Sequence, residues 1–599
     1  MAVARLALTS FTDGGEGRLS DEVELYQRTY TTLLRSSGET QLRVLEPSHM
    51  AMGSSLHPLA ASEELDLGAF LYAVQRLPDR IAGAELVVMS QDVAQLTASG
   101  VPVDSWEEAE APARRRRWYD SGSGTLAVLL ASASDVDDLV PTLVAYQIEW
   151  NKIRVRMRAA GWPRSQSPGL GPEECARELG GSADDWSRLR TAWGNRFDER
   201  MRAVGERRLA LRVRMLGGSH TGYARLTRRW WAPVSAELGE SVPPALTERP
   251  LYFVSSNSHS LVNIVTGIAQ EREPELVAFV EQLPEDDILR QELTAFREGR
   301  SEGSWENFLY FVARLYFSAQ GPEAGAERRA AEMRRGVTHL RSTTALRVPA
   351  QVISLGGLDP HALDPRVGEV DAAALAASGA VIVNIDYPLG VAAYNILREV
   401  AVDRTGLRGV YILGKAATLN ADVGDVMISS VVHDEHTGST YWLDNAFSVD
   451  DLAADLRFGT GLDNQRAVTV KSTFLQNRAY LDFYYREAFT VVEMEAGPFC
   501  DAVYEIADAD RHPVNEAVNF SKLPIDLGII HYASDTPYTQ ARTLGARGLS
   551  YYGMDSTYAS SLAILRRILR LEGVLGDVAG RELTRPYGAP TLPPDATRS

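Results

Sequence analysis

Short apolar runs alternate with helical patterns in the second half of the chain. Residues 351–355, 381–385 and 410–413 are apolar and rich in β-branched side chains, which is typical of buried strands. Residues 373–377 and 391–402, which separate these runs, carry apolar residues at helical spacing. Because parallel strands need a crossover between them, this alternation predicts an α/β domain with a largely parallel sheet.

The first half of the chain has a different pattern. Residues 19–34, 137–158 and 186–213 place apolar residues at helical spacing, with arginine and glutamate on the other faces. Residues 84–89 and 125–131 are short apolar runs that predict buried strands. The pattern therefore predicts a mainly helical α+β region.

The change of pattern about halfway along the chain predicts its division into domains. We expect an N-terminal region over 1–341, which could divide into two subdomains, 1–134 and 135–341. An α/β domain is expected over 342–580. Proline-rich composition predicts a disordered tail over 581–599.

Composition narrows the range of functions. The 599 residues carry a formal net charge of −18, which argues against a general nucleic-acid binder and favours a small-molecule substrate. The two cysteines lie far apart, in no metal or redox spacing. With no run of about 18 apolar residues and no signal-peptide pattern at the start, we expect a soluble cytoplasmic protein with no membrane partner.

Two glutamates stand at the end of an apolar run. Phe489–Val492 predicts a strand that Gly497 and Pro498 limit. Residues two apart on a strand share a face, so Glu493 and Glu495 should point into one cavity. A carboxylate that accepts two hydrogen bonds suits the vicinal hydroxyls of a ribose, although solvated charges at a strand end would give the same pattern.

Four further clusters carry polar or charged side chains. The basic stretch 114–119 could meet an anionic ligand or partner, but a solvated turn is the favoured interpretation. His49 and His57 lie close in sequence, and structural roles are favoured over catalysis. Residues 255–260 precede an expected helix, and either an anion site or N-capping explains their hydroxyls. The run 433–436 holds two histidines and two carboxylates, and we expect a hairpin turn there and no metal site.

Four motifs follow one another in the second half of the chain. They are Asn384–Val391, Val410–Leu419 with Gly424–Ile428, Ser472–Phe474 with Glu493–Glu495, and Ala533–Pro537. In this order they resemble the anion loop, the strand with its glycine turn, the ribose-binding glutamates and the Ser-Asp signature of the nucleoside phosphorylase and nucleosidase superfamily. The resemblance covers only the α/β domain, and it implies a three-layer fold around a central mixed sheet.

The resemblance implies a role for each matching residue. Asp535 would be the acid at purine N7 and Glu495 would hold the ribose 2′ and 3′ hydroxyls, so both are candidate catalytic residues. The other candidate substrate-binding residues are Glu493, Met494 against the sugar, Phe474 stacked on the base, Ser534, Gly414, Lys415, Ala416 and Gly390. The resemblance implies no metal or cofactor, and it implies a homo-oligomer because active sites of the superfamily often include a residue of a neighbouring subunit.

The sequence departs from the superfamily pattern at two places. Lys415 stands where a small hydroxyl residue is usual and could bind an anionic group, while a lysine exposed to solvent is the alternative. The loop 356–361 lacks the glutamate that often activates water, although Asp359 could replace it. Asn384 and the motif Ser534–Pro537 resemble the AMP nucleosidase branch, in which the substrate carries a 5′-phosphate.

The favoured hypothesis is hydrolysis of the N-glycosidic bond of a purine nucleoside or nucleotide. Water is preferred over phosphate because a phosphate-binding hydroxyl at position 415 and an arginine beside Gly414 are both missing. Phosphorolysis, with phosphate as a second small-molecule partner, stays an alternative. So does a purine nucleotide sensor without turnover, whose N-terminal region would bind a partner protein.

Overall fold

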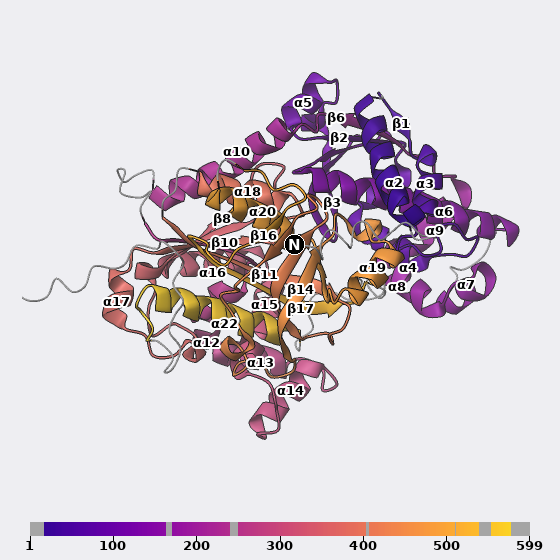
Figure 1. Cartoon of the computed structure of the whole chain (residues 1–599). Helices are drawn as coiled ribbons and strands as arrows, with labels where there is room; N and C mark the ends of the chain where they lie inside the picture. Colours follow the sequence, from indigo (N-terminus) through magenta and orange to yellow (C-terminus); the bar gives the residue numbers. More distant parts are fainter. Residues whose placement is uncertain are drawn as a thin grey trace, which may run out of the picture.

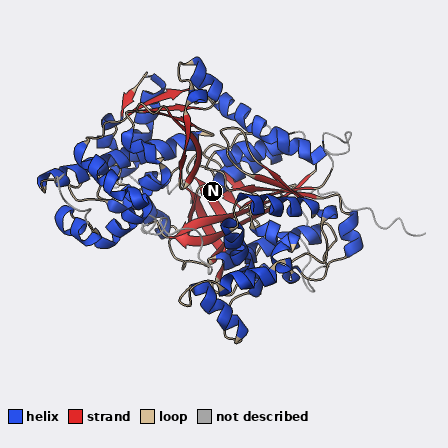
Figure 2. Cartoon of the chain, turned by 180° about the vertical axis from the view of Figure 1, so that it is seen from behind, coloured by secondary structure: helices blue, strands red, loops and turns tan. Residues whose placement is uncertain are grey.

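The structure contains two β-sheets, each flanked by helices, and is a mixed α/β protein (Figure 1, Figure 2). The computed structural model describes residues 17–36, 38–162, 171–239, 249–402, 406–508, 511–537 and 553–576. The expected disordered tail, 581–599, lies outside these residues. Within them, no helix combines the length and the apolar character needed to cross a membrane.

The smaller sheet is formed by the N-terminal part of the chain. Its strands, in spatial order, are β1 (Thr40–Gln41), β6 (Arg212–Leu216), β2 (Leu86–Ser90), β5 (Thr125–Leu129), β4 (Arg114–Asp120) and β3 (Glu107–Ala111). The helices of this part are α2 (Gly17–Ser36), α3 (Glu46–Ala51), α4 (Leu67–Arg76), α5 (Val93–Ala98), α6 (Ala133–Ala159), α7 (Pro172–Leu179), α8 (Ala183–Trp193) and α9 (Phe197–Glu206). The alternative division between residues 134 and 135 falls inside α6, and β6 returns after α6 to pair with β1 and β2. The N-terminal part therefore has one continuous sheet and no break at that point.

The larger sheet is mixed. Its strands, in spatial order, are β16 (Ala517–Asn519), β13 (Thr440–Trp442), β12 (Val426–Asp434), β14 (Gly461–Thr469), β15 (Val491–Glu493), β11 (Leu407–Thr418), β7 (Leu251–Ser256), β10 (Val381–Asp386), β9 (Ala350–Ser354) and β8 (Val337–Leu340), with β17 (Asp526–Asp535) paired to β11 and β12. Strand β7 is parallel to β10 and β11, and β11 is parallel to β17. Strand β9 is antiparallel to β10, and β15 is antiparallel to β11.

Strand β7 lies in the middle of the larger sheet, between β10 and β11. The sequence pattern assigned residues 251–256 to the N-terminal region. The expected boundary at residue 342 therefore does not separate the two sheets. The apolar run 251–254 predicts the strand but not its partners, because those partners lie far away in sequence.

Helices cover both faces of the larger sheet (Figure 1). They are α10 (His220–Gly239), α11 (Ser260–Thr266), α12 (Ile268–Glu271), α13 (Glu273–Glu281), α14 (Ile288–Arg297), α15 (Trp305–Ala319), α16 (Pro322–Arg334), α17 (Ala372–Ala377), α18 (Ala392–Ala401), α19 (Arg478–Arg486), α20 (Ala496–Ala507) and α22 (Met554–Leu571).

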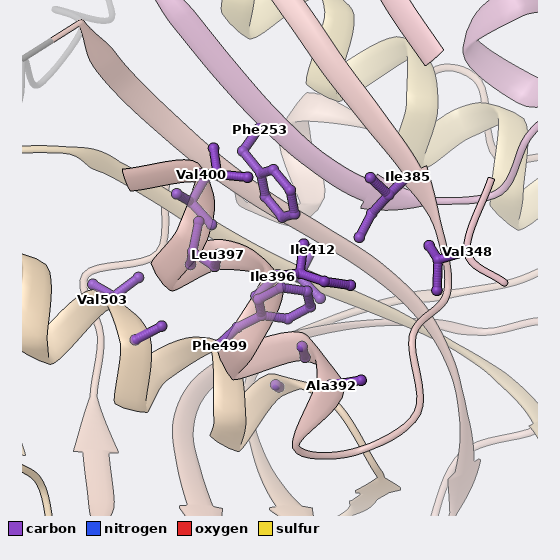
Figure 3. Close-up of a cluster of buried hydrophobic side chains, with 14 of the residues drawn as sticks. Phe253, Val348, Ile385, Ala392, Ile396, Leu397, Val400, Ile412, Phe499 and Val503 are labelled. Atoms are coloured by element: carbon purple, nitrogen blue, oxygen red, sulfur yellow. The ribbon is translucent and has the colours of Figure 1, made fainter. Parts of the chain in front are cut away.

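Helices α18 and α20 pack on one face of the sheet. The contact is formed by Phe253, Ile385, Ile412, Ile396, Leu397 and Phe499 (Figure 3). The ring centroids of Phe253 on β7 and Phe499 on α20 lie 5.7 Å apart. Burying each side chain of this size is worth about 1.5–3 kcal/mol, so β7 is an integral part of this core.

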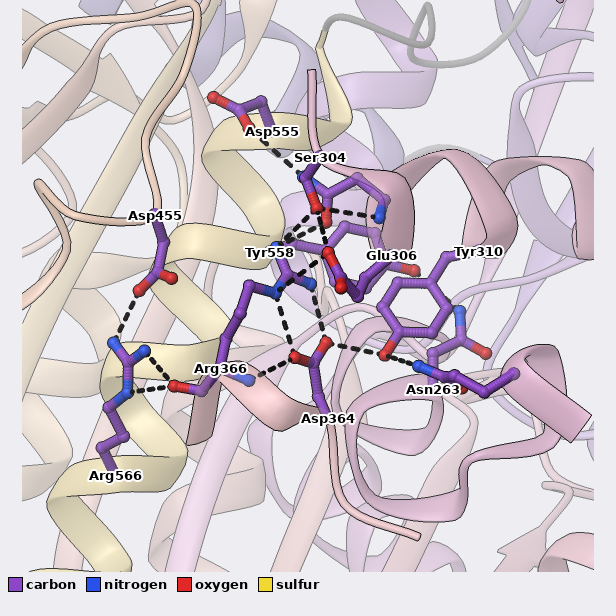
Figure 4. Close-up of polar contacts among 12 residues, drawn as sticks. Asn263, Ser304, Glu306, Tyr310, Asp364, Arg366, Asp455, Asp555, Tyr558 and Arg566 are labelled. Carbon is purple, nitrogen blue, oxygen red and sulfur yellow. Dashed lines mark hydrogen bonds and ion pairs between the residues drawn. The ribbon is translucent and has the colours of Figure 1, made fainter. Parts of the chain in front are cut away.

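A polar network joins three segments on the opposite face. The carboxylate of Asp364 accepts a hydrogen bond from the Tyr310 hydroxyl at 2.7 Å and pairs with Arg366 at 2.7 Å (Figure 4). Arg366 also donates to the side-chain oxygen of Asn307 at 3.0 Å. The amide of Asn307 donates to Asp555 of α22 at 3.2 Å. The network fixes α15 against α22 and the turn that contains Arg366.

The N-terminal part docks directly on the larger sheet. Ser54 forms an isolated β-bridge with Asn477. At the start of α6, the hydroxyl of Ser134 accepts a hydrogen bond from the backbone N–H of Val391 at 2.9 Å. Gly390 has a φ of +53°, and a Cβ there would lie 2.2 Å from the Ser134 oxygen. This close approach requires glycine.

Replacing Gly390 by alanine should therefore destabilise the docked arrangement by about 1–3 kcal/mol, because the new methyl group meets Ser134 in a left-handed backbone conformation. Thermal unfolding of the purified protein would measure the effect. The matched control is Gly379→Ala, where an added Cβ has no atom within 4 Å. The double change Gly390→Ala with Ser134→Gly should recover part of the loss; an unchanged melting temperature in Gly390→Ala would contradict the contact.

Candidate active site

A cavity of about 330 Å³ lies where the N-terminal part meets the larger sheet. Seven of the ten predicted site residues line it: Lys415, Ala416, Glu493, Met494, Glu495, Ser534 and Asp535. The N-terminal part contributes Tyr72, Arg76, Arg114, Arg115 and Arg116 to the same walls. The cavity therefore combines carboxylates of the larger sheet with cations from both parts.

Three adjacent strands position the residues of the larger sheet. Strand β11 lies between β15 and β17, and its residue Ala417 faces both Val492 and Asp535. The pairing of β11 with β17 shifts register between Ala416 and Ala417, which leaves Ser534 as an extra residue. The Ser534 hydroxyl donates to the carbonyl of Ala416 at 3.3 Å. Such a bulge bends the strand, and here it turns the end of β17, with Asp535, to the cavity.

Glu493 holds the turn between β15 and α20. One of its carboxylate oxygens accepts hydrogen bonds from the backbone N–H groups of Glu495 at 2.6 Å and Ala496 at 2.7 Å. The Thr469 hydroxyl donates to its other oxygen. Because the first N–H groups of a helix need acceptors, this carboxylate acts as a cap and orients Glu495. The argument from a shared strand face does not predict that role.

Glu495 has an unusual proton affinity. Burial is the main cause that raises the pKa of its carboxyl to about 8, and the neighbouring charge of Glu493 raises it further. Lys415 and Arg114 act in the opposite direction. The carboxyl is therefore largely protonated at pH 7, and a ligand hydroxyl that donates to it would favour the ionised form.

Lys415 exposes its side chain to the cavity. The surrounding protein lowers the pKa of Lys415 by desolvation, an effect that Asp535 opposes. Arg114 and Arg76 lower this pKa further by repulsion, and Glu495 raises it. Lys415, Arg76 and Arg114 are thus close enough to Asp535 and Glu495 at this cavity to influence one another's charge.

The basic stretch that favoured a solvated turn is strand β4. Arg114 and Arg116 share one face of this strand and pair with Asp138 of α6 at 2.9 and 2.7 Å. Arg115 points the other way and pairs with Asp386 at 2.7 Å. The turn interpretation is wrong because acidic partners from α6 and β10 compensate the charges, and these partners are distant in sequence.

Two buried donors at the cavity, Arg76 Nε and Tyr72 Oη, make no hydrogen bond within the described residues, and neither does the acceptor Gln476 Oε1 in the same wall. Arg76 is 4% exposed, and its guanidinium lies 3.3 Å from the ring centroid of Tyr72. Burial lowers the pKa of Arg76 to about 10. Buried donors without acceptors are rare and costly, so their position at the cavity points to a ligand. Neither residue has a motif that sequence reasoning could find.

Three predicted site residues do not line the cavity. Phe474 is fully buried, with its ring centroid 5.2 Å from that of Tyr72 and 5.9 Å from that of His49. It cannot stack on a base here, because the N-terminal part covers it. Gly414 is buried inside β11, and Gly390 contacts the start of α6.

The two N-terminal histidines belong to a buried chain of hydrogen bonds. His49 contacts the Tyr26 hydroxyl at 3.2 Å and His57 at 3.0 Å, and His57 contacts Glu149 at 2.9 Å. Desolvation lowers the pKa of His49 well below its ordinary value. None of these four residues lines the cavity, which supports the structural interpretation.

The run 433–436 ends β12 and turns towards β13. Within it, His436 pairs with Asp434 at 2.7 Å. Across the described ranges, no group of three or more histidine, cysteine, aspartate or glutamate side chains is placed to hold a metal ion.

The chain belongs to a family of unknown function, DUF6909, whose model matches residues 42–570. No curated protein matches the chain.

Several solved structures are similar to part of the chain. A methylthioadenosine/S-adenosylhomocysteine nucleosidase from Colwellia psychrerythraea in complex with adenine is 15% identical, over 40% of this chain and 88% of that one, with a TM-score of 0.27. The corresponding nucleosidase from Neisseria meningitidis with methylthio-immucillin-A is 14% identical, over 40% and 94%, with a TM-score of 0.27. A purine nucleoside phosphorylase from Toxoplasma gondii with immucillin-H is 14% identical, over 42% and 89%, with a TM-score of 0.28.

The raised pKa of Glu495 predicts a pH dependence of stability. Between its ordinary pKa of 4.5 and about 8, the folded state keeps a proton that the unfolded state releases. Stability from this group is therefore complete below pH 4.5 and is lost as the pH rises through 8.

Glu495→Gln should remove this loss, so its melting temperature should fall less steeply than that of the wild type between pH 5 and pH 8. Thermal unfolding across this range is the measurement, and Glu487→Gln, on the exposed surface, is the matched control. Equal slopes in the Glu495→Gln variant and the wild type would show that the carboxyl is not buried as described.

Proposed function

We propose that the cavity cleaves the N-glycosidic bond of a purine nucleoside or nucleotide by hydrolysis. The observation that carries the proposal is the convergence of Glu495 and Met494 from the turn after β15, Lys415 from β11 and Asp535 from β17 on one cavity. Cleavage leaves negative charge on the base and positive character on the sugar. A site for it needs an acid on one side of the bond and a carboxylate on the other.

Asp535 is proposed as the acid at purine N7. It stands at the end of β17, where the bulge turns it to the cavity, across β11 from the turn that carries Glu495. Glu495 would accept hydrogen bonds from the ribose 2′ and 3′ hydroxyls and, once ionised, would stabilise the oxocarbenium-like sugar. Met494, which also lines the cavity, would lie against the sugar.

The base would be held without Phe474. Apolar side chains at the cavity come instead from Leu346, Val348 and Leu389. A flat purine fits such a surface, because most of a small-molecule site is apolar with a few polar groups that fix orientation.

Water is the proposed nucleophile. The loop that resembles the superfamily's anion loop has its Val391 N–H bonded to Ser134, and the space beside Gly390 is filled by the same serine. The N-terminal part thus takes up hydrogen-bonding capacity that a phosphate co-substrate would need. This supports hydrolysis over phosphorolysis.

The cations favour a nucleotide as substrate. Lys415 and Arg76 line the cavity, and the Arg76 Nε and Tyr72 Oη donors have no acceptor among the described residues. A 5′-phosphate would supply acceptors for both donors, and guanidinium groups suit phosphate oxygens. A neutral nucleoside would bring no negative charge to the Arg76 guanidinium.

The direct test is release of free base, followed by chromatography, from AMP, adenosine, inosine, guanosine and methylthioadenosine, with and without phosphate. We expect release from a nucleotide in the absence of phosphate. Strict dependence on phosphate would establish phosphorolysis instead. Binding of a purine without release from any of the five would support a sensor and contradict the proposal.

Asp535→Asn should leave nucleotide binding largely intact and lower kcat by about 10² or more, the usual scale for a general acid. The matched control is Asp422→Asn, an exposed carboxylate that does not line the cavity. Kinetics and equilibrium binding of both variants give the two readouts. A kcat near that of the wild type in the Asp535→Asn variant would refute the assignment of the acid.

A further inference from the structure

A second cavity, of about 760 Å³, lies beside the first and shares part of its wall. The hairpin of β3 and β4 forms one wall, α15 and α16 form another, and the segment from β8 to β9 closes it. Eight arginines line it: Arg114, Arg115, Arg116, Arg314, Arg328, Arg329, Arg341 and Arg347. Glu110 and Glu332 are the carboxylates of its walls. We call this cavity the arginine chamber.

Several of these arginines have acidic partners. The β4 arginines pair with aspartates as described, and Arg328 pairs with Glu332 at 2.7 Å. Arg347 lies 3.4 Å from Glu108. These pairs hold the walls in place and leave little net charge at their own positions.

Three arginines of the chamber are different. Arg314, Arg329 and Arg341 form no ion pair with any carboxylate in the described ranges. Arg314 and Arg341 are exposed, and Arg314 stacks on the ring of Phe311 at 4.8 Å. Three unpaired guanidinium groups at one concave surface produce a local positive electrostatic potential, although the whole chain carries a formal net charge of −18.

His259 interacts electrostatically with two arginines of the chamber, Arg314 and Arg328. It lies in the chamber wall, and burial is the main cause that lowers the pKa of its imidazole to about 4. The positive charges of Arg314 and Arg328 lower this pKa further. Of the three unpaired arginines, Arg314 therefore acts on this wall of the chamber.

The wall of the chamber is anchored to the core. Arg328 donates to the side-chain oxygen of Asn263 at 3.0 Å, and the Asn263 amide donates to the Tyr558 hydroxyl of α22 at 2.7 Å. Asn263 and Tyr558 lie in the polar network of Figure 4, in which Tyr310 of α15 also takes part. Helices α15 and α16 are thus held before any ligand arrives, which reduces the entropy lost on binding.

We propose that the arginine chamber binds the phosphate groups of a small polyanionic molecule, such as an oligophosphate chain. Guanidinium groups donate two parallel hydrogen bonds to phosphate oxygens, and several phosphates are needed to match three unpaired charges. The volume is that of a small-molecule site. The chamber shares Arg114, Arg115, Arg116 and Arg347 with the candidate active site, so its ligand lies next to the substrate.

Inorganic tripolyphosphate is the probe, and titration calorimetry on the full chain is the measurement. We expect saturable binding that weakens as salt is added. The triple variant Arg314→Gln, Arg329→Gln, Arg341→Gln should bind about tenfold more weakly or worse, because it loses three charge-assisted contacts. The matched control, Arg43→Gln, Arg202→Gln, Arg225→Gln, removes the same charge from exposed positions outside the chamber and should bind as the wild type does.

No binding of tripolyphosphate to the wild type at millimolar concentration would overturn the proposal. So would equal weakening in the control variant, because the effect would then come from net charge alone. Binding of single-stranded RNA without binding of tripolyphosphate would also overturn it, in favour of a nucleic-acid surface.

Competition separates the two sources of the phosphates, and this arm rests on the proposed function. If they belong to the substrate, a nucleoside triphosphate should bind more tightly than tripolyphosphate and displace it. If they belong to a separate effector, adenosine and tripolyphosphate should bind together to one protein molecule. Binding of tripolyphosphate without release of any base would refute the proposed function, while it would still support phosphate binding by the arginine chamber.

Discussion

The buried pairing of Arg114 and Arg116 with Asp135 and Asp138 is the constraint on which both cavities depend. Asp138 is 1% exposed, and the two arginines hold the pKa of its carboxyl well below the ordinary range. Charges taken out of water are tolerated only when their partners are fixed, so these pairs lock strand β4 to the start of α6. These ion pairs also position the arginines of β4 at both cavities. They place the start of α6 against the loop that contains Gly390.

In the candidate active site, the proposed catalytic carboxyl groups and most of the cations come from different parts of the chain. The carboxyl of Glu495, with its raised pKa, and the carboxylate of Asp535 come from strand ends of the larger sheet. Apart from Lys415 and Arg347, the cations come from the N-terminal part, which therefore supplies a cationic wall to a site whose proposed acid and sugar-binding groups lie elsewhere. The first half of the chain thus forms part of the wall of the candidate site.

Local patterns predicted much of the fold but little of its assembly. Residues 351–355, 381–385 and 410–413 each correspond to a strand of the structure, because apolar and β-branched side chains specify a buried strand locally. Their order in the sheet depends on contacts between distant residues. The resemblance to a known superfamily implied that Glu495 and Asp535 share one site, and both line one cavity in the structure. It could not show that the N-terminal part covers Phe474, or that the arginines of β4 have partners on α6.

The central position of β7 also decides how the protein can be dissected. Its edges hydrogen-bond to β10 and β11, and its Phe253 lies in the core under α18 and α20. A fragment that starts at residue 342 would expose both of those strand edges to solvent and to other chains. An autonomous unit that contains the larger sheet would have to begin before Leu251, and even then it would present the surface that now meets α6 as a bare, partly apolar face.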